Sequence, residues 1–140
     1  MNITCVIGAR GGSKGLIGKN YRLLLNKPLI AWSIEQALAC KEINKVIVST
    51  DSAEIKKISL NYGAEVPFTR PEKYALDYTP KWDVWKHALG FCDKFYDEPT
   101  DLYIDLDCTS PLRDVDDISK AIELFNRQNV DAVFTICNAR

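Results

Sequence analysis

Short apolar runs of strand type alternate with amphipathic stretches of helical type along this chain, and this alternation most constrains its fold. The expected strands cover residues 3–7, 46–48, 65–68, 102–106 and 130–136. Between them, apolar residues recur at intervals of three and four, which predicts helices. Strand–helix–strand units favour right-handed crossovers and parallel pairing. We therefore expect an α/β fold in which a mostly parallel sheet carries helices on both faces.

Four helices are expected in the intervening segments. The first begins at Pro28, and the second begins with a capping box that places Asp51 in the cap and ends at Gly63. The third begins with Thr79 as N-cap and Pro80 in the first turn. Its expected core-packing face is Trp82, Trp85, Leu89, Cys92 and Tyr96. The fourth has an apolar stripe of Val115, Ile118, Ile122 and Phe125.

The composition is that of one globular domain spanning residues 1–140. Of these residues, 46% are hydrophobic and 26% are charged, and the formal net charge is −1. The five cysteines are widely spaced without a CxxC pair, so we expect buried thiols in a reducing cytoplasm rather than disulfides or a zinc site. No apolar run approaches the length of a membrane span, and no basic leader marks a secretory signal.

Charge is distributed unevenly along the chain. Residues 1–34 contain no carboxylate and five cations, which are Arg10, Lys14, Lys19, Arg22 and Lys27. Such a segment predicts an anionic partner. The net charge of −1 and the absence of a basic stripe interleaved with aromatics argue against nucleic acid. A small polyanion such as a nucleotide fits better.

Three of these cations, Arg10, Lys14 and Lys19, lie in a glycine-rich loop at residues 8–20, directly after the first expected strand. It is not a Walker A loop, because Ser13 stands where that motif requires a glycine before the lysine, here Lys14. It is not GxGxxG either, because Arg10 replaces the second glycine, which disfavours a dinucleotide. Glycines let backbone N–H groups approach phosphate oxygens, and the loop's own cations neutralise their charge. The loop therefore predicts phosphate binding, with a plain turn as the alternative.

Four ordered motifs resemble those of the acylneuraminate cytidylyltransferases, the CMP-N-acetylneuraminic acid synthetases. The first is Ala9-Arg10-Gly11-Gly12-Ser13-Lys14-Gly15 followed by Lys19-Asn20. The second is Ser49-Thr50-Asp51. The third is Arg70-Pro71 with Asp77 and His87-Ala88-Leu89, and the fourth is Thr109-Ser110-Pro111-Leu112-Arg113. The resemblance covers essentially all 140 residues and corresponds to the N-terminal portion of the family.

This resemblance implies a Rossmann-like nucleotidyltransferase fold, that of the nucleotide-diphospho-sugar transferases. It implies that CTP and a nine-carbon sugar acid react with the aid of Mg²⁺ to give the CMP-sugar and pyrophosphate. The family's sugar-acid-binding and dimerisation part would then lie beyond residue 140, and a homodimer is consistent with the sheet edge left unfinished after the last expected strand.

The resemblance also implies roles for individual residues. Arg10 and Lys19 would act in catalysis by contacting the triphosphate and stabilising the leaving pyrophosphate. The wider set expected to bind the nucleotide is Ala9, Arg10, Gly12, Lys14, Lys19, Asn20, Arg70, Asp107, Thr109 and Ser110.

The sequence departs from the family pattern at the end of the fourth expected strand and at the start of the third expected helix. Asp107-Cys108 replaces the usual Gln-Pro, whose Gln meets the cytosine, so base selectivity becomes an open question. Asp105 and Asp107 lie on one side of the strand, and we consider them as Mg²⁺ ligands. The alternative is that Asp105 meets a nearby cation. Lys81 replaces a small hydroxyl residue near the nucleotide.

Other interpretations remain open at this point. The chain could be a nucleotidyltransferase for another nucleoside triphosphate or sugar, or a catalytically incomplete nucleotide-binding fragment. His87, the single histidine, is expected to be structural because no nucleophile motif accompanies it. Cys108 lies beside the expected site, but a nucleophile requires a base partner, so a buried thiol is the favoured interpretation.

Overall fold

A parallel three-stranded sheet forms the centre of the computed structural model, which describes residues 1–136. Strand β1 (Ile3–Gly8) lies between β4 (Lys45–Ser49) and β5 (Leu102–Asp105). In the register, Cys5 stands opposite Val46 on one side and Ile104 on the other. The expected parallel sheet is therefore confirmed.

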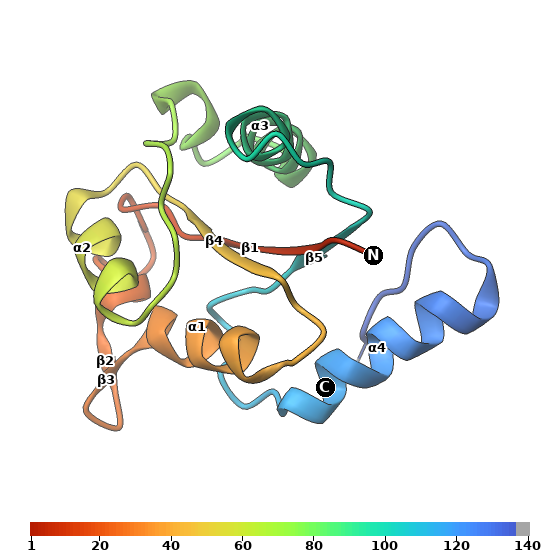
Figure 1. Cartoon of the computed structure of the whole chain (residues 1–140). Helices are drawn as coiled ribbons and strands as arrows, with labels where there is room; N and C mark the ends of the chain where they lie inside the picture. Colours follow the sequence, from red (N-terminus) through yellow and green to blue (C-terminus); the bar gives the residue numbers. More distant parts are fainter. Residues whose placement is uncertain (137–140) are drawn as a thin grey trace.

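Helices cover both faces of this sheet (Figure 1). One face carries α3 (Lys81–Phe95), and the other carries α1 (Leu29–Ala39), α2 (Ala53–Asn61) and α4 (Val115–Gln128). Successive residues of β1 point to opposite faces, so Ile7 packs toward α1 and α2 while Val6 packs toward α3. Because both faces are covered, β1 is a nearly continuous apolar run.

Smaller elements join these layers. They are a 3₁₀ turn η1 (Lys19–Tyr21), an antiparallel pair of β2 (Leu23–Leu24) and β3 (Lys27–Pro28), and a second 3₁₀ turn η2 (Glu72–Tyr74). The sequence had not indicated the β2–β3 hairpin. Its turn is made by Leu25 and Asn26, both in the left-handed region with φ of 50° and 63°.

One expected strand is reduced to a single bridge, and another does not form. Residues 65–68 contribute one parallel bridge, between Glu65 and Ile47, rather than a strand. Residues 130–136 form no strand, and Phe134 is 77% exposed. Alternating apolar character alone does not make a strand, because backbone N–H and C=O groups need a neighbouring strand. Within residues 1–136, none pairs with this segment.

The capping box expected at Asp51 is also wrong. Ser52 caps α2 instead, and its Oγ accepts a hydrogen bond of 3.3 Å from the backbone N–H of Ile55. Asp51 Oδ1 accepts from the backbone N–H of Gly11 at 2.8 Å. The carboxylate therefore holds the glycine-rich loop rather than the helix start.

Helix α3 differs from expectation in its cap and in its buried face. Pro80 is the N-cap, and the hydroxyl of Thr79 donates to the carbonyl oxygen of Lys73 at 3.0 Å. Trp82 is 59% exposed and does not belong to the core face, whereas Cys92 is buried as expected. The buried residues recur at intervals of four: Val84, Ala88 and Cys92.

The cysteine prediction holds for the part of the chain that the structure describes. Cys5, Cys40, Cys92 and Cys108 are buried free thiols, and Cys137 lies outside the described residues. No helix among residues 1–136 is long and apolar enough to cross a membrane.

His87 lies against aromatic rings, as expected for a structural histidine. Its ring centroid is 5.0 Å from that of Phe68 and 4.9 Å from that of Tyr74. Its Nδ1 atom is buried and has no hydrogen-bond partner within residues 1–136. Burial, followed by the charges of Arg70 and Lys73, lowers the pKa of His87 below its usual value.

This lowered pKa makes folding stability sensitive to acid. The unfolded chain takes up a proton at the ordinary pKa of about 6.5, and the folded chain only at lower pH. Stability is therefore fully present above about pH 6.5 and is lost as pH falls toward the folded pKa. We expect the melting temperature to fall between about pH 7.5 and pH 5.5 in the wild type. The fall should be smaller in His87→Phe, and equal falls in both proteins would contradict this prediction.

Candidate nucleotide-binding site

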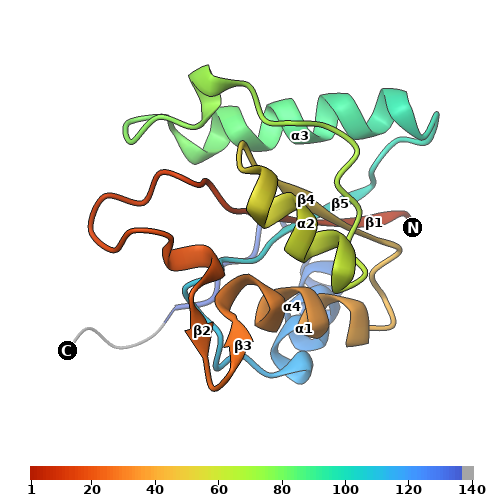
Figure 2. The same ribbon diagram turned by 90° about the vertical axis from the view of Figure 1, so that its left-hand side faces the viewer.

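A pocket of about 500 Å³ opens at the carboxyl ends of β1 and β5. One wall is the glycine-rich loop after β1, and the other is the segment that leads from Arg70 into α3. Both segments project from the same end of the sheet (Figure 2). Ligands of parallel α/β sheets bind at this edge because the loops that follow the strands gather there.

The glycine-rich loop is held in place by side chains from outside its tip. The buried amide of Asn20 donates to the carbonyl oxygen of Arg10 at 3.1 Å. Gly11 is tied to Asp51 by the hydrogen bond described above. Gly18 has a φ of +68°, and a Cβ there would lie 2.4 Å from the ring of Tyr21. Glycine is thus required at this bend, and the hydrogen bonds of Asn20 and Asp51 connect the loop to its surroundings.

Three cations of this loop line the pocket: Arg10, Lys14 and Lys19. Arg10 and Lys14 both form ion pairs with the carboxylate of Asp77 from the opposite wall. The hydrogen bond from Lys14, followed by the one from Arg10, lowers the pKa of Asp77. These two cations therefore already hold one anionic group, and the phosphates of a ligand would compete with Asp77 for them.

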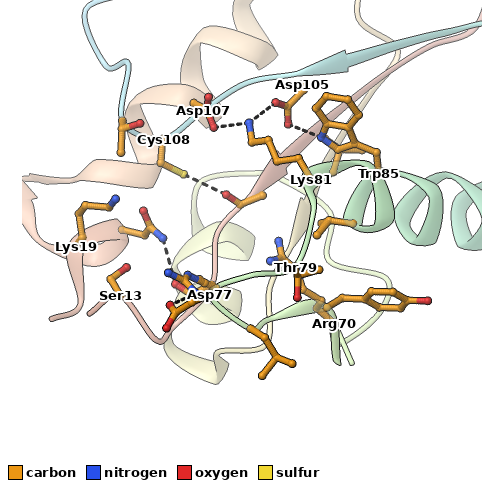
Figure 3. A pocket seen from close by; sticks show the side chains of 18 of the residues that line it. Ser13, Lys19, Arg70, Asp77, Thr79, Lys81, Trp85, Asp105, Asp107 and Cys108 are labelled. Atoms are coloured by element: carbon orange, nitrogen blue, oxygen red, sulfur yellow. Dashed lines mark hydrogen bonds and ion pairs between the residues drawn. The ribbon is translucent and has the colours of Figure 1, made fainter. Parts of the chain in front are cut away.

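Arg70 supplies a fourth cation from the floor of the pocket (Figure 3). It is only 6% exposed. Its Nε donates to Ser49 Oγ at 3.0 Å, and its Nη2 donates to the carbonyl oxygen of Ser49 at 2.5 Å. Burial lowers its pKa. Within residues 1–136 it forms no ion pair, so its positive charge is available to a bound anion.

A second polar group stands at the end of β5. Lys81 Nζ lies 2.6 Å from Asp105 Oδ2 and 2.7 Å from Asp107 Oδ1 (Figure 3). The indole of Trp85 donates to the other oxygen of Asp105 at 3.1 Å. Burial alone would lower the pKa of Lys81, but the hydrogen bonds to both carboxylates raise it above its usual value. Lys81 is therefore a firmly charged ammonium group between two carboxylates.

Hydrogen bonds from α1 and from the loop that follows β5 hold the backbone at Asp107. Its carbonyl oxygen accepts hydrogen bonds of 3.1 Å from Ser33 Oγ and from Arg113 Nη2. Gln36 in turn accepts from Arg113 Nη1 at 2.9 Å and donates to the carbonyl oxygen of Pro111 at 2.8 Å. The segment 107–113 is thus positioned by a network that begins in α1.

Cys108 lines the same pocket, but its thiol has low reactivity. It is 3% exposed, and burial raises the pKa of its thiol to about 12. The protonated thiol is a weak nucleophile. The favoured interpretation of Cys108 as a buried thiol agrees with this environment.

Most of the residues predicted for the site do line this pocket: Arg10, Lys14, Lys19, Asn20, Arg70, Asp105, Asp107 and Thr109. Ala9, Gly12 and Ser110 are not among the lining residues. Ala9 is buried, and its N–H donates to the carbonyl oxygen of Ser49 within the fold. Trp85 was missed as a site residue, because its spacing in α3 indicated core packing.

The pair Asp105 and Asp107 does not fit a metal ion as it stands. Both oxygens of Asp105 and one oxygen of Asp107 are already hydrogen-bonded to Lys81 or Trp85. Residues 1–136 contain no group of three or more His, Cys, Asp or Glu side chains that could hold an ion. The alternative expectation, that Asp105 contacts a nearby cation, agrees with its ion pair with Lys81.

The parallel sheet with helices on both faces and the pocket at the carboxyl ends of its strands define a class of protein, the open parallel α/β domains. The sequence model described as "Cytidylyltransferase" matches residues 4–139. The chain therefore belongs to the cytidylyltransferase family.

Curated relatives support this membership over most of the chain. Post-translational flagellin modification protein B of Campylobacter coli is 43% identical over 138 residues, which are 99% of this chain and 59% of the relative. CMP-N,N'-diacetyllegionaminic acid synthase of Legionella pneumophila is 41% identical over 89% of this chain and 53% of its own. N-acylneuraminate cytidylyltransferase of Escherichia coli is 40% identical over 88% of this chain and 28% of its own.

A solved structure confirms the fold. The CMP:2-keto-3-deoxy-manno-octonic acid synthetase, complexed with CTP, superimposes with a TM-score of 0.76 at 23% identity. The match covers 92% of this chain and 49% of the other. The chain thus spans about half of this structure and 28–59% of the curated relatives named above.

Proposed function

We propose that this chain is the CTP-binding part of a cytidylyltransferase that activates a sialic-acid-like sugar acid. The observation that carries this proposal is the cluster of Arg10, Lys14 and Lys19 on a glycine loop at the mouth of the pocket. Backbone N–H groups and cations together suit a triphosphate, whose charge exceeds what either alone would neutralise. The sugar-acid part of the proposal is supported by the names of two relatives, the N-acylneuraminate cytidylyltransferase and the CMP-N,N'-diacetyllegionaminic acid synthase.

In the reaction, a hydroxyl oxygen of the sugar acid attacks the α-phosphorus of CTP. A new P–O bond forms, the bond to the β-phosphate oxygen breaks, and pyrophosphate departs while the hydroxyl proton is released. Positioning and charge neutralisation provide most of the catalysis in such phosphorus chemistry. Arg10 and Lys19 would hold the departing phosphates, and Asn20 would keep the loop in its binding shape through Arg10.

The Asp105–Asp107 pair does not offer a site for the Mg²⁺ ion that the family implies, because it already holds Lys81. A requirement for Mg²⁺, the homodimer and the sugar-acid site stay predictions. Because the proposed reaction consumes CTP, we propose that the protein acts in the cytoplasm.

Calorimetric titration with CTP and with cytidine tests this proposal. We expect CTP to bind at least about thirtyfold more tightly than cytidine, because charge-assisted hydrogen bonds to phosphate each contribute strongly. The affinity for CTP should fall with added salt, and that for cytidine should not. Equal affinity for the two ligands would contradict the role of the loop.

A second assay separates catalysis from binding. The chain is incubated with CTP, Mg²⁺ and N-acetylneuraminic, legionaminic or pseudaminic acid, and pyrophosphate release is measured. Release with one of these acids supports the transferase. Binding of CTP without release identifies instead a nucleotide-binding fragment that requires further sequence for catalysis.

A further inference from the structure

One peptide group of the glycine-rich loop, the group that joins Arg10 to Gly11, is hydrogen-bonded at both of its ends. Its carbonyl oxygen accepts a hydrogen bond of 3.1 Å from the buried amide of Asn20, and its N–H donates to Asp51 Oδ1 at 2.8 Å. The two atoms point to opposite sides of a planar group. Holding both therefore limits the rotation of the backbone on either side, and with it the direction in which the Arg10 side chain leaves the loop.

The backbone around Asp51 is itself anchored. Asp51 lies between the end of β4 and the N-cap of α2, which is Ser52. The N–H of Ser52 donates to Thr50 Oγ1 at 3.1 Å, and Thr50 is buried. A Cβ on Gly11 would lie 3.0 Å from the Cβ of Ser52, so the loop packs closely against this helix start. Asp51 thus joins the glycine-rich loop to the sheet and the helix behind it.

The position of Asp51 separates it from the residues that can meet a ligand directly. Asp51 is not among the described residues that line the pocket, whereas Arg10 is. A carboxylate repels a polyanionic triphosphate, so the charge of Asp51 by itself disfavours the proposed ligand. Any benefit of Asp51 to ligand binding therefore comes from the geometry that it gives to the loop.

We propose that Asp51 is a positioning residue, which orients Arg10 toward the phosphates of the bound nucleotide through the Arg10–Gly11 peptide group. This inference rests on the proposed function. In the free protein the guanidinium of Arg10 already points across the pocket, where it pairs with Asp77. An arginine that is held in its binding direction before the ligand arrives loses less conformational freedom on binding, which raises the affinity.

Titration calorimetry with CTP tests this assignment in three variants of Asp51. Asp51→Ala removes the acceptor, and we expect CTP to bind about 5- to 20-fold more weakly, because the loop must then be ordered on binding. Asp51→Asn keeps a carbonyl oxygen and loses the charge, so its affinity should stay within about twofold of the wild type. Asp51→Glu keeps the charge and moves the acceptor by one methylene, so we expect a loss of at least about threefold.

Two further measurements separate positioning from a merely structural role. Amide hydrogen exchange at Gly11, followed by NMR without ligand, should be faster in Asp51→Ala than in the wild type or in Asp51→Asn, because only the alanine variant lacks the acceptor. In the Arg10→Ala background, Asp51→Ala should weaken CTP binding by less than about twofold further, because no guanidinium remains to be oriented.

Glu54→Ala is the matched control, because Glu54 is an exposed carboxylate in the first turn of α2. It removes the same charge from the same helix start and should change CTP affinity by less than about twofold. Circular dichroism establishes that each variant is folded, and Asp51→Glu provides the second test if Asp51→Ala unfolds.

The outcomes distinguish this inference from the proposed function. The positioning role alone is overturned if CTP affinity is unchanged or increased in Asp51→Ala, or if Asp51→Asn loses as much affinity as Asp51→Ala. Full additivity of Asp51→Ala with Arg10→Ala overturns it as well, because the two residues would then act independently. A wild type that binds no CTP overturns the proposed function and, with it, the role of Asp51 in binding.

Discussion

Arg10→Ala is expected to weaken CTP binding by about 10- to 100-fold. Arg10 lines the pocket, and its guanidinium is held toward the opposite wall by its ion pair with Asp77. A hydrogen bond to a charged group contributes about 1.5–3 kcal/mol, and the alanine variant loses it without disturbing a buried core. Titration calorimetry measures the change, and the slope of affinity against salt should decrease as well.

The matched control for this prediction is Arg127→Ala. Arg127 pairs with Glu123 on the exposed side of α4, and its side chain is 71% exposed. Its removal takes away the same charge far from the pocket and should change CTP affinity by less than about twofold. Unchanged CTP affinity in Arg10→Ala would contradict the phosphate-binding role of the loop.

Asp77→Asn is expected to strengthen CTP binding, which is the opposite of the change expected for Arg10→Ala. The Asp77 carboxylate occupies Arg10 and Lys14 in the free protein, so a phosphate must displace it. The neutral amide competes less, and we expect CTP affinity to rise about two- to fivefold, the range typical of exposed ion pairs. Weaker binding in this variant would mean that Asp77 contributes to the bound state rather than competing with it.

Ile7→Ala is expected to produce the largest loss of stability, about 2–5 kcal/mol in the free energy of unfolding. Ile7 is fully buried in the central strand and packs in the core beneath α1 and α2. The variant loses apolar burial and leaves a cavity that the rigid sheet cannot close. Urea denaturation measures the loss as a lower midpoint with an unchanged m value.

Ile17→Ala is the control for Ile7→Ala. Ile17 is 80% exposed at the surface, so the same chemical change should alter stability by no more than about 0.5 kcal/mol. A loss below about 1 kcal/mol in Ile7→Ala would show that the sheet is packed less tightly than its complete burial indicates.

The central strands and the glycine-rich loop could be predicted because their signals are local. β1 is a continuous apolar run followed at once by glycines and cations, and both features can be recognised within about 20 residues. The segment 130–136 carries a comparable apolar pattern yet forms no strand. Strand formation requires a partner strand, and apolar character does not report whether one is present.

The phase of α3 could not be predicted for a related reason. Trp82 and Trp85 are large and apolar, so helical spacing placed them on the core face. The sheet accepts the small side chains of Cys92, which was expected, and of Ala88, which was not, and Trp85 turns its indole to Asp105. Which face of a helix is buried depends on the shape of the surface that it covers.

The amino-acid sequence by itself determined the order of strands and helices, the glycine loop and the cations that the loop carries. These depend on backbone propensity, apolar periodicity and residue type within short windows. Tertiary structure alone decided that Lys81 lies between Asp105 and Asp107, at sequence separations of 24 and 26 residues. It also decided that Asp77 holds Arg10 across the pocket. Such contacts join segments that meet only when the sheet has formed, because parallel strands gather their distant loops at one edge.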